Sequence, residues 1–113
     1  VIYGDGKQTR DFAFVKDVVK ANMLAMQKNV EGVFNIASGQ STSINELAAK
    51  IIELAGKDFE PVYTDERPGD IKHSLADISL ARKKLGYEPE YSLDEGLRVT
   101  MGWYRSESRN RNV

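Results

Sequence analysis

Short apolar segments alternate with amphipathic helices along the 113 residues, and this order predicts an α/β protein. Taken by itself, the chain is better described as α+β, with short strands and about four helices. Each strand-like segment stands apart from any hairpin partner. Open strand edges of that kind are costly in so short a chain unless something else covers them.

Several segments have the composition of strands, because β-branched and aromatic residues fill them and glycine, proline or polar residues bound them. They are residues 1–3, 11–15, 32–37 and 61–64. The segment at 32–37 is almost entirely apolar, which is typical of a strand buried on both faces of a parallel sheet. The polar stretch that follows, residues 38–42, is predicted to be a loop.

Capping residues and apolar positions that recur with a period of about 3.6 predict the helices. The clearest start is Ser43, which forms a capping box with Glu46. Asp17 is predicted to cap the first helix, and Asp77 or Ser79 the third. The first three helices are expected over residues 17–27, 43–55 and 77–85, with Gly56 and Gly86 ending the last two.

A second capping box, Ser92 with Glu95, predicts the last helix, which is expected to continue to about residue 104. From Arg105 onward the sequence is polar and aperiodic, so the final residues are predicted to fray. We therefore expect one domain over residues 1–105, followed by a polar tail over residues 106–113. Because the first residue is Val1 rather than Met and a strand-like segment begins at once, we expect the chain to start within a fold.

The composition excludes several classes of function. The 16 basic and 17 acidic residues leave a net charge of -1, so the broad basic surface needed for non-specific nucleic-acid or anionic-membrane binding is absent. The chain has no Cys, which excludes disulfides, thiolate metal sites and a Cys nucleophile, and fits a cytoplasmic location. No apolar run approaches the roughly 20 residues that cross a bilayer. We therefore expect neither nucleic acid nor a membrane as partner.

The common catalytic and cofactor-binding motifs are not found. His73 is the only histidine, and its loop position predicts a solvated side chain rather than a catalytic or metal-binding one. The glycines form neither the phosphate-binding loop nor the dinucleotide fingerprint. Tyr3 and Lys7 match the Y-x-x-x-K pair of some dehydrogenases, but that pair needs a helix, and residues 4–6 predict a turn. No catalytic, cofactor-binding or metal-binding residue is therefore expected in this chain.

Arg10, Arg67 and Asp70 are the charged residues best placed to bind a ligand. Arg67 and Asp70 flank Pro68-Gly69, a short rigid reversal that can aim both side chains one way. Two guanidinium groups suit a diphosphate, and a neighbouring carboxylate can accept bonds from ribose or sugar hydroxyls. The alternative, which these residues alone favour, is that both arginines form exposed ion pairs of little worth. The partners would then be Asp11 or Asp17 for Arg10, and Glu66 or Asp70 for Arg67.

Longer stretches around these residues resemble a known family. The stretches are GDGKQTRDFAFVKDV at residues 4–18, FNIASG at 34–39, RPGD at 67–70 and LGYEP at 85–89. In order and spacing they resemble the C-terminal part of the extended short-chain dehydrogenase/reductase family. The closest resemblance is to its NAD-dependent nucleotide-sugar epimerases and dehydratases, the UDP-glucose 4-epimerases above all. Ala37 replaces a glycine usual in the family, and residues 72–74 stand where some 4-epimerases have a tyrosine.

The resemblance implies the substrate-binding portion of an extended Rossmann-type enzyme. It implies that Arg10 and Arg67 contact the diphosphate of a UDP-sugar and that Asp70 contacts the ribose. Phe12 and Ile44 resemble positions that line the nucleotide pocket, with ordinary packing or capping as an equal alternative. NAD and the catalytic residues would be held upstream and not by this chain, which would be inactive alone. The whole enzyme would be a cytoplasmic homodimer.

Two other functions remain open at this stage. A dTDP- or GDP-sugar dehydratase or reductase of the same family would share these motifs. A stand-alone nucleotide-binding or interaction module without catalysis would account for the missing catalytic residues. The leading hypothesis is a UDP-sugar 4-epimerase, in which this chain anchors the diphosphate while C4 of the sugar is oxidised and re-reduced elsewhere.

Overall fold

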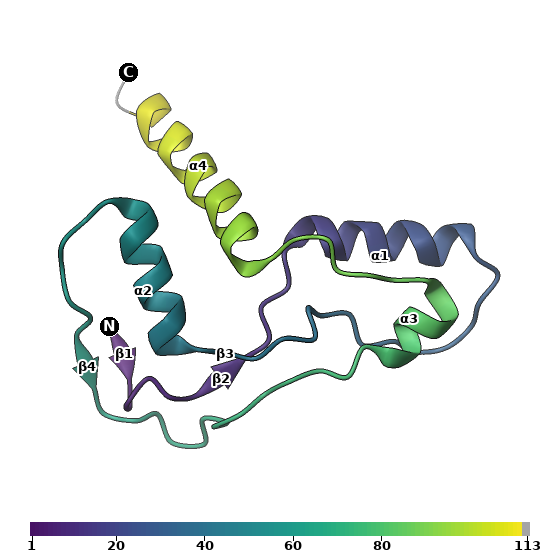
Figure 1. The fold of residues 1–113 in the computed structure, drawn as a ribbon, viewed down its shortest axis with the longest axis horizontal. Coiled ribbons are helices and arrows are strands. Elements are labelled where there is room, and N and C mark those ends of the chain that lie inside the picture. Colours follow the sequence, from purple (N-terminus) through teal and green to yellow (C-terminus); the bar gives the residue numbers. More distant parts are fainter. Residues whose placement is uncertain (112–113) are drawn as a thin grey trace.

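The computed structural model describes residues 1–111, in which short strands and four helices follow one another along an open chain (Figure 1). The helices are α1 (Val15–Gln27), α2 (Ile44–Ala55), α3 (Ser79–Leu85) and α4 (Leu93–Arg111). The strands are β1 (Ile2–Tyr3), β2 (Thr9–Arg10), β3 (Thr42–Ser43) and β4 (Tyr63–Thr64). This alternation of short strands with helices confirms the predicted fold class.

Short strand pairings bring together segments that are far apart in the sequence. β1 pairs with β4 in parallel, and β2 pairs with β3 in antiparallel, with Thr9 opposite Ser43. On its other side Thr9 forms a parallel bridge with His73. The Thr9 N–H donates to the carbonyl of Lys72 at 2.8 Å, and the Thr9 carbonyl accepts from the N–H of Ser74 at 3.1 Å. β2 is therefore held on both edges.

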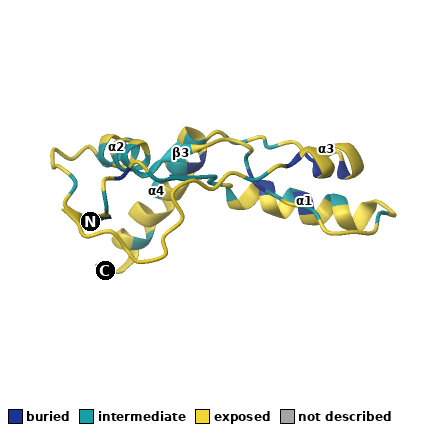
Figure 2. Cartoon of the chain, turned by 90° about the horizontal axis from the view of Figure 1, so that it is seen from below, coloured by how far each residue is buried: buried dark blue, intermediate teal, exposed yellow. Residues whose placement is uncertain are grey.

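The hydrophobic core lies at one end of the molecule, between α1 and α3 (Figure 2). Tyr87 is almost completely buried there and donates its hydroxyl hydrogen to the Ala37 carbonyl at 2.8 Å. Burial raises the pKa of Tyr87, and the nearby carboxylates of Asp17 and Asp11 raise it further. The buried members of this core are Ala21, Ala37, Ile78, Ala81, Leu85 and Tyr87.

Away from this core the chain is thin and open. Its radius of gyration is 16.9 Å and its extents are 49 × 41 × 20 Å. A compact domain of this length would have a radius of gyration of about 13 Å. Much of the apolar stripe of α1 is consequently exposed, including Val18, Val19, Met23 and Met26.

Two of the predicted strands are wrong. Residues 11–14 are irregular, and residue 15 already belongs to α1. Residues 32–37 also lie outside any strand. A strand needs a partner for its backbone N–H and C=O groups, and within residues 1–111 neither segment has one. β3, conversely, extends into the segment predicted as a polar loop, because pairing with β2 orders it.

Asp17 does not cap α1. Phe14 occupies the cap position, and Asp17 lies in the first turn of the helix, where it is only 3% exposed. Its carboxylate accepts hydrogen bonds from the backbone N–H of Glu90 at 2.9 Å and of Tyr91 at 3.3 Å. Asp17 therefore joins α1 to the segment before α4, a contact that no local pattern reveals.

The starts of α2 and α4 follow local signals closely, whereas the start of α3 differs from the prediction. The Ser43 hydroxyl accepts the N–H of Glu46 at 3.1 Å, which confirms the first capping box, and Ser92 accepts the N–H of Glu95 at the same distance. The cap position of α3 is Ile78, not Asp77 or Ser79 as predicted. The Asp77 carboxylate nevertheless accepts the N–H of Ser79 at 2.9 Å. Gly56 and Gly86 end α2 and α3 in the left-handed conformation.

The last helix is longer than predicted. α4 continues through Arg111, so a frayed tail beginning at residue 106 is wrong for residues 106–111, while residues 112–113 of that predicted tail lie outside the described residues. Arg109 and Arg111 in its last turn favour the helix electrostatically. Arg105 also donates to the Leu54 carbonyl at 2.5 Å, which attaches α4 to α2. Within residues 1–111, none of the helices is both long and apolar enough to cross a bilayer.

Candidate functional site

Arg10 ends β2, and its guanidinium is held from two directions. Nη2 donates to Oδ1 of Asp70 at 2.8 Å, and Nη1 donates to the Thr9 carbonyl at 2.7 Å. The side chains of Arg10 and Asp70 are 26% and 31% exposed, so this ion pair is partly shielded from solvent. The predicted pairing of Arg10 with Asp11 or Asp17 is wrong, because those two carboxylates bind backbone N–H groups elsewhere.

The segment that carries Arg67 and Asp70 is a tight turn. The N–H of Asp70 donates to the Arg67 carbonyl at 3.2 Å, and Gly69 adopts a φ of 78° that favours glycine. The Arg67 guanidinium lies over the ring of Tyr3, 3.8 Å from its centroid, in a cation–π contact. Within residues 1–111, Arg67 makes no ion pair with Glu66 or Asp70, so that prediction is wrong.

A cavity of about 140 Å³ lies between the glycine turn and the segment that follows β4. Tyr3 and Asp70, which hold the two arginines, both line it. Pockets that enclose a whole drug-sized ligand measure about 300–1,000 Å³. The cavity is therefore smaller than a pocket that encloses such a ligand. Its other lining residues are Gly4, Asp5, Gln8, Glu66, Ile71 and Lys72.

Phe12 and Ile44 lie outside the lining of this cavity. Phe12 lines a different cavity of about 330 Å³, together with Ser38, Thr42 and the segment before α4. Ile44 is the first residue of α2, is half-buried, and donates its backbone N–H to the Gln8 carbonyl at 3.0 Å. The structure thus brings Arg10 and Asp70 into contact and places Arg67 against a wall of the first cavity, but it does not bring Phe12 there.

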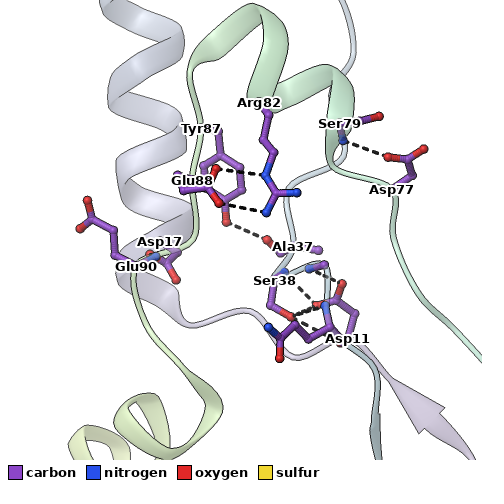
Figure 3. Close-up of polar contacts among 12 residues, drawn as sticks. Asp11, Asp17, Ala37, Ser38, Asp77, Ser79, Arg82, Tyr87, Glu88 and Glu90 are labelled. Atoms are coloured by element: carbon purple, nitrogen blue, oxygen red, sulfur yellow. Dashed lines mark hydrogen bonds and ion pairs between the residues drawn. The ribbon is translucent and has the colours of Figure 1, made fainter.

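Asp11, directly after Arg10, anchors this part of the chain to the loop after residue 37 (Figure 3). Its Oδ1 accepts hydrogen bonds from the N–H and the hydroxyl of Ser38, at 2.8 and 2.5 Å. Its Oδ2 accepts from the N–H of Gly39 at 2.9 Å. From the sequence, Asp11 is expected only as a partner for Arg10. Its contact with Ser38 joins residues 27 positions apart and leaves no local pattern.

His73 and the Tyr3–Lys7 pair both lie close to β2. His73 is exposed as predicted, but it is not simply a solvated loop residue, since its Nδ1 lies 3.0 Å from the Thr9 hydroxyl. Tyr3 and Lys7 do not share a helix. Gly4 and Gly6 have φ values of 82° and 72°, so the segment between Tyr3 and Lys7 is a turn, as predicted.

The glycine turn also bears on cofactor binding. A dinucleotide site of the Rossmann type needs a strand, a glycine-rich turn and a helix whose N-terminus faces the pyrophosphate. Here the turn at residues 4–6 leads into β2, and the first turn of α2 is already bonded to this loop. Residues 4–6 therefore do not form a dinucleotide-binding turn of this type.

Comparison with known proteins identifies the family. Residues 1–100 match the GDP-mannose 4,6 dehydratase family, and the chain belongs to it. This confirms the resemblance to the extended short-chain dehydrogenases/reductases. A solved UDP-glucose 4-epimerase from Thermotoga maritima, in complex with UDP-glucose, is 46% identical with a TM-score of 0.90. That similarity covers 94% of this chain and 34% of the epimerase.

Other similar proteins are named for UDP-sugar reactions or were solved with a UDP-sugar. The UDP-glucose 4-epimerase of Mycolicibacterium smegmatis is 38% identical over 96% of this chain and 35% of its own length. UDP-glucuronic acid decarboxylase 1 of Xenopus tropicalis is 36% identical over 94% of this chain and 25% of its own. MoeE5, solved with UDP-glucuronic acid and NAD, is 39% identical with a TM-score of 0.87, covering 94% of this chain and 36% of MoeE5. The chain thus spans about a third or less of these proteins.

Proposed function

We propose that this chain is the substrate-binding part of an NAD-dependent UDP-sugar 4-epimerase. In this proposal Arg10 and Arg67 hold the diphosphate and Asp70 accepts a hydrogen bond from the ribose. The observation that carries it is the contact between Arg10 and Asp70. These residues are 60 positions apart, and their side chains meet at 2.8 Å beside a cavity that Asp70 lines.

The geometry of the ion pair leaves each partner able to bind a ligand. Asp70 receives Arg10 on Oδ1, so its second oxygen can accept a hydroxyl hydrogen. Arg10 donates to Asp70 and to Thr9 through its two Nη atoms, and a guanidinium carries further N–H donors that suit a phosphate. Asp70 therefore orients Arg10 and leaves further N–H groups of its guanidinium for a ligand. Such contacts supply binding energy that holds the nucleotide while the sugar reacts.

Phe12 and Ile44 complete the proposed site on the nucleotide side. A role for Ile44 is supported by the hydrogen bond that its backbone N–H donates to the carbonyl of Gln8, a residue that lines the first cavity. Phe12 is two residues from Arg10 and faces the larger cavity, so its ring would reach the ligand only from that side. NAD would be bound outside this chain, which is supported by the turn at residues 4–6 leading into β2 rather than into a helix.

Removing the second arginine tests the proposal directly. In the enzyme that contains this chain, Arg67→Ala should raise the KM for UDP-glucose at least about tenfold, which corresponds to about 1.4 kcal/mol of lost binding energy. The NAD content of the purified enzyme should not change. Arg109→Ala, in the last turn of α4, is the matched control and should leave KM unchanged. An unchanged KM in Arg67→Ala would sink the assignment.

The family match also supports a second candidate, a nucleotide-sugar dehydratase, because it is described as a GDP-mannose 4,6 dehydratase family. Incubation of the enzyme with UDP-glucose should yield UDP-galactose if it is an epimerase. A dehydratase would form a 4-keto-6-deoxy sugar from its own substrate instead. Product analysis with UDP-, dTDP- and GDP-glucose and GDP-mannose therefore separates the two.

The proposal extends to the state of the whole enzyme, which would be a homodimer in the cytoplasm. Light scattering would test the dimer, and cell fractionation would test the location.

A further inference from the structure

Asn45, in the first turn of α2, connects the two loops that carry the arginines. Its Nδ2 donates to the Asp5 carbonyl at 3.0 Å, and its Oδ1 accepts the hydroxyl hydrogen of Tyr63 at 2.8 Å. Asp5 lies in the turn that leads to β2 and Arg10. Tyr63 lies in β4, which leads to the turn with Arg67. One side-chain amide therefore bridges both loops.

The glycine turn packs tightly against this asparagine. The backbone N–H of Asn45 donates to the Gly6 carbonyl at 2.9 Å, and the N–H of Ile44 donates to the Gln8 carbonyl at 3.0 Å. These N–H groups belong to the first turn of a helix and have no partner within it. Gly6 is buried, and a Cβ at this position would overlap the amide oxygen of Asn45. The turn and the asparagine therefore fix each other.

The other contacts between the two loops are short strand pairings or involve the arginines themselves, as in the Arg10–Asp70 ion pair and the Arg67–Tyr3 contact. β1 and β4 pair over two residues each, and β2 meets the segment after Arg67 through the bridge between Thr9 and His73. A diphosphate held by two guanidinium groups needs both at a fixed separation, and displacement of a binding group weakens binding steeply. When loops must become ordered on binding, the entropy cost of that ordering also weakens the affinity for the ligand.

We propose that Asn45 is a positioning residue that holds Arg10 and Arg67 at the separation required by a nucleoside diphosphate. The inference rests on the proposed function, in which both arginines contact the diphosphate. Asn45 acts through the loops on either side of it and needs no contact with the ligand. Its contribution therefore depends on the presence of both arginines.

Calorimetric titration of the whole enzyme with UDP tests this inference. Arg10→Ala should weaken UDP binding at least about tenfold. Asn45→Ala should weaken it about three- to tenfold, with the kcat for UDP-glucose unchanged and the KM raised. Asn45→Asp keeps the size but places an oxygen against the Asp5 carbonyl, so it should resemble Asn45→Ala. Asn22→Ala, exposed on α1, is the matched control and should bind UDP normally.

A double variant separates positioning from general stability. Because a separation matters only while both arginines are present, Asn45→Ala should weaken UDP binding by less than about twofold in the Arg10→Ala background. A merely structural role would lower Tm, leave the affinity of the folded enzyme unchanged and show no such coupling. Full additivity of the two substitutions would overturn the inference.

The remaining outcomes distinguish this inference from the proposed function. Normal UDP affinity in Asn45→Ala, with weakened affinity in Arg10→Ala, overturns the role of Asn45 and leaves the proposed function standing. Normal affinity in Arg10→Ala overturns the proposed function itself. If Asn45→Ala does not fold, the UDP affinities of Tyr63→Phe and Asn45→Asp decide whether Asn45 has this role. Weaker UDP binding in both supports the inference, and unchanged binding in either overturns it.

Discussion

The α1–α3 end and the β1–β4 end of the molecule are held together by different interactions. Between α1 and α3, apolar side chains such as Leu85 and Tyr87 are 2% and 1% exposed. Around the strands, Ile2 is the single apolar side chain that is buried, within residues 1–111. The loops there are joined mainly by hydrogen bonds to backbone groups. The core end therefore carries stability, while the strand end carries the candidate site.

Two carboxylates near the core end bind backbone N–H groups of distant segments (Figure 3). Asp11 accepts backbone N–H groups of residues 38 and 39, and Asp17 accepts those of residues 90 and 91. Charge-assisted bonds of this kind hold segments together with little apolar surface. Substitutions at the core end should therefore lower stability, whereas substitutions at the strand end should lower ligand affinity.

The largest effect is expected in the core. Leu85→Ala should lower the free energy of unfolding by about 2–5 kcal/mol, because it removes buried contacts and leaves a cavity. Chemical denaturation of the whole enzyme measures this change. Leu80→Ala, on the same helix but 46% exposed, is the control and should cost much less. Equal losses in both variants would contradict a core between α1 and α3.

Gly6, at the strand end, should affect both stability and ligand binding when it is substituted. Gly6→Ala should lower the free energy of unfolding by about 1–3 kcal/mol, because a φ of 72° strains alanine and its Cβ would displace Asn45. It should also weaken UDP binding, which Leu85→Ala should not do below the melting temperature. In contrast, Gly102→Ala meets no atom within 4 Å on helix α4 and should stabilise the protein by about 0.5–1 kcal/mol. Stability changes of the same sign would refute this account of Gly6.

Alkaline pH should act on the core end. Burial raises the pKa of Tyr87 above its usual 10.0, so its contribution to stability is complete below pH 10 and is lost as pH rises through the folded-state pKa. Tyr87→Phe loses the bond to Ala37 and should be about 0.5–1.5 kcal/mol less stable at neutral pH. That difference should shrink above pH 10. A stability difference between Tyr87→Phe and the wild type that stays constant from neutral to strongly alkaline pH would contradict this role of the Tyr87 hydroxyl.

The smallest effect is expected at the start of α3. Hydrogen bonds from the Ser79 hydroxyl and N–H lower the pKa of Asp77 below its usual 3.8. The stabilisation that Asp77 provides is therefore present above pH 3.8 and is lost as pH falls through its folded-state pKa. Asp77→Asn should show a slightly flatter acid denaturation profile than the wild type. Identical profiles would mean that this bond does not contribute to stability.

Local patterns predicted the helices well because their signals lie within a few residues. Ser43 with Glu46 and Ser92 with Glu95 form their capping bonds within one helical turn. The same reasoning failed for Asp17, whose position before an apolar stripe is typical of a cap. Its true partners lie more than 70 residues away. It also failed for residues 11–15 and 32–37, where strand composition is present without a pairing partner.

The candidate site was predictable in its residues but not in its arrangement. Arg10, Arg67 and Asp70 stand in motifs that the sequence displays. The contacts of Arg10 with Asp70 and of Arg67 with Tyr3 join residues about 60 positions apart, and no local pattern reports them. Asn45 was missed for the same reason. Its type and place in α2 suggest only an ordinary helix start.

The sequence by itself determined the charged residues available for a ligand, the capping boxes that start α2 and α4, and the glycines that end α2 and α3. The caps and the glycine ends were readable because they depend on local conformational preference. Only the tertiary structure decided which charges meet, which segments become strands and where the core lies. Those outcomes depend on pairing and burial between distant segments, since a hydrogen bond or an ion pair needs both partners in place.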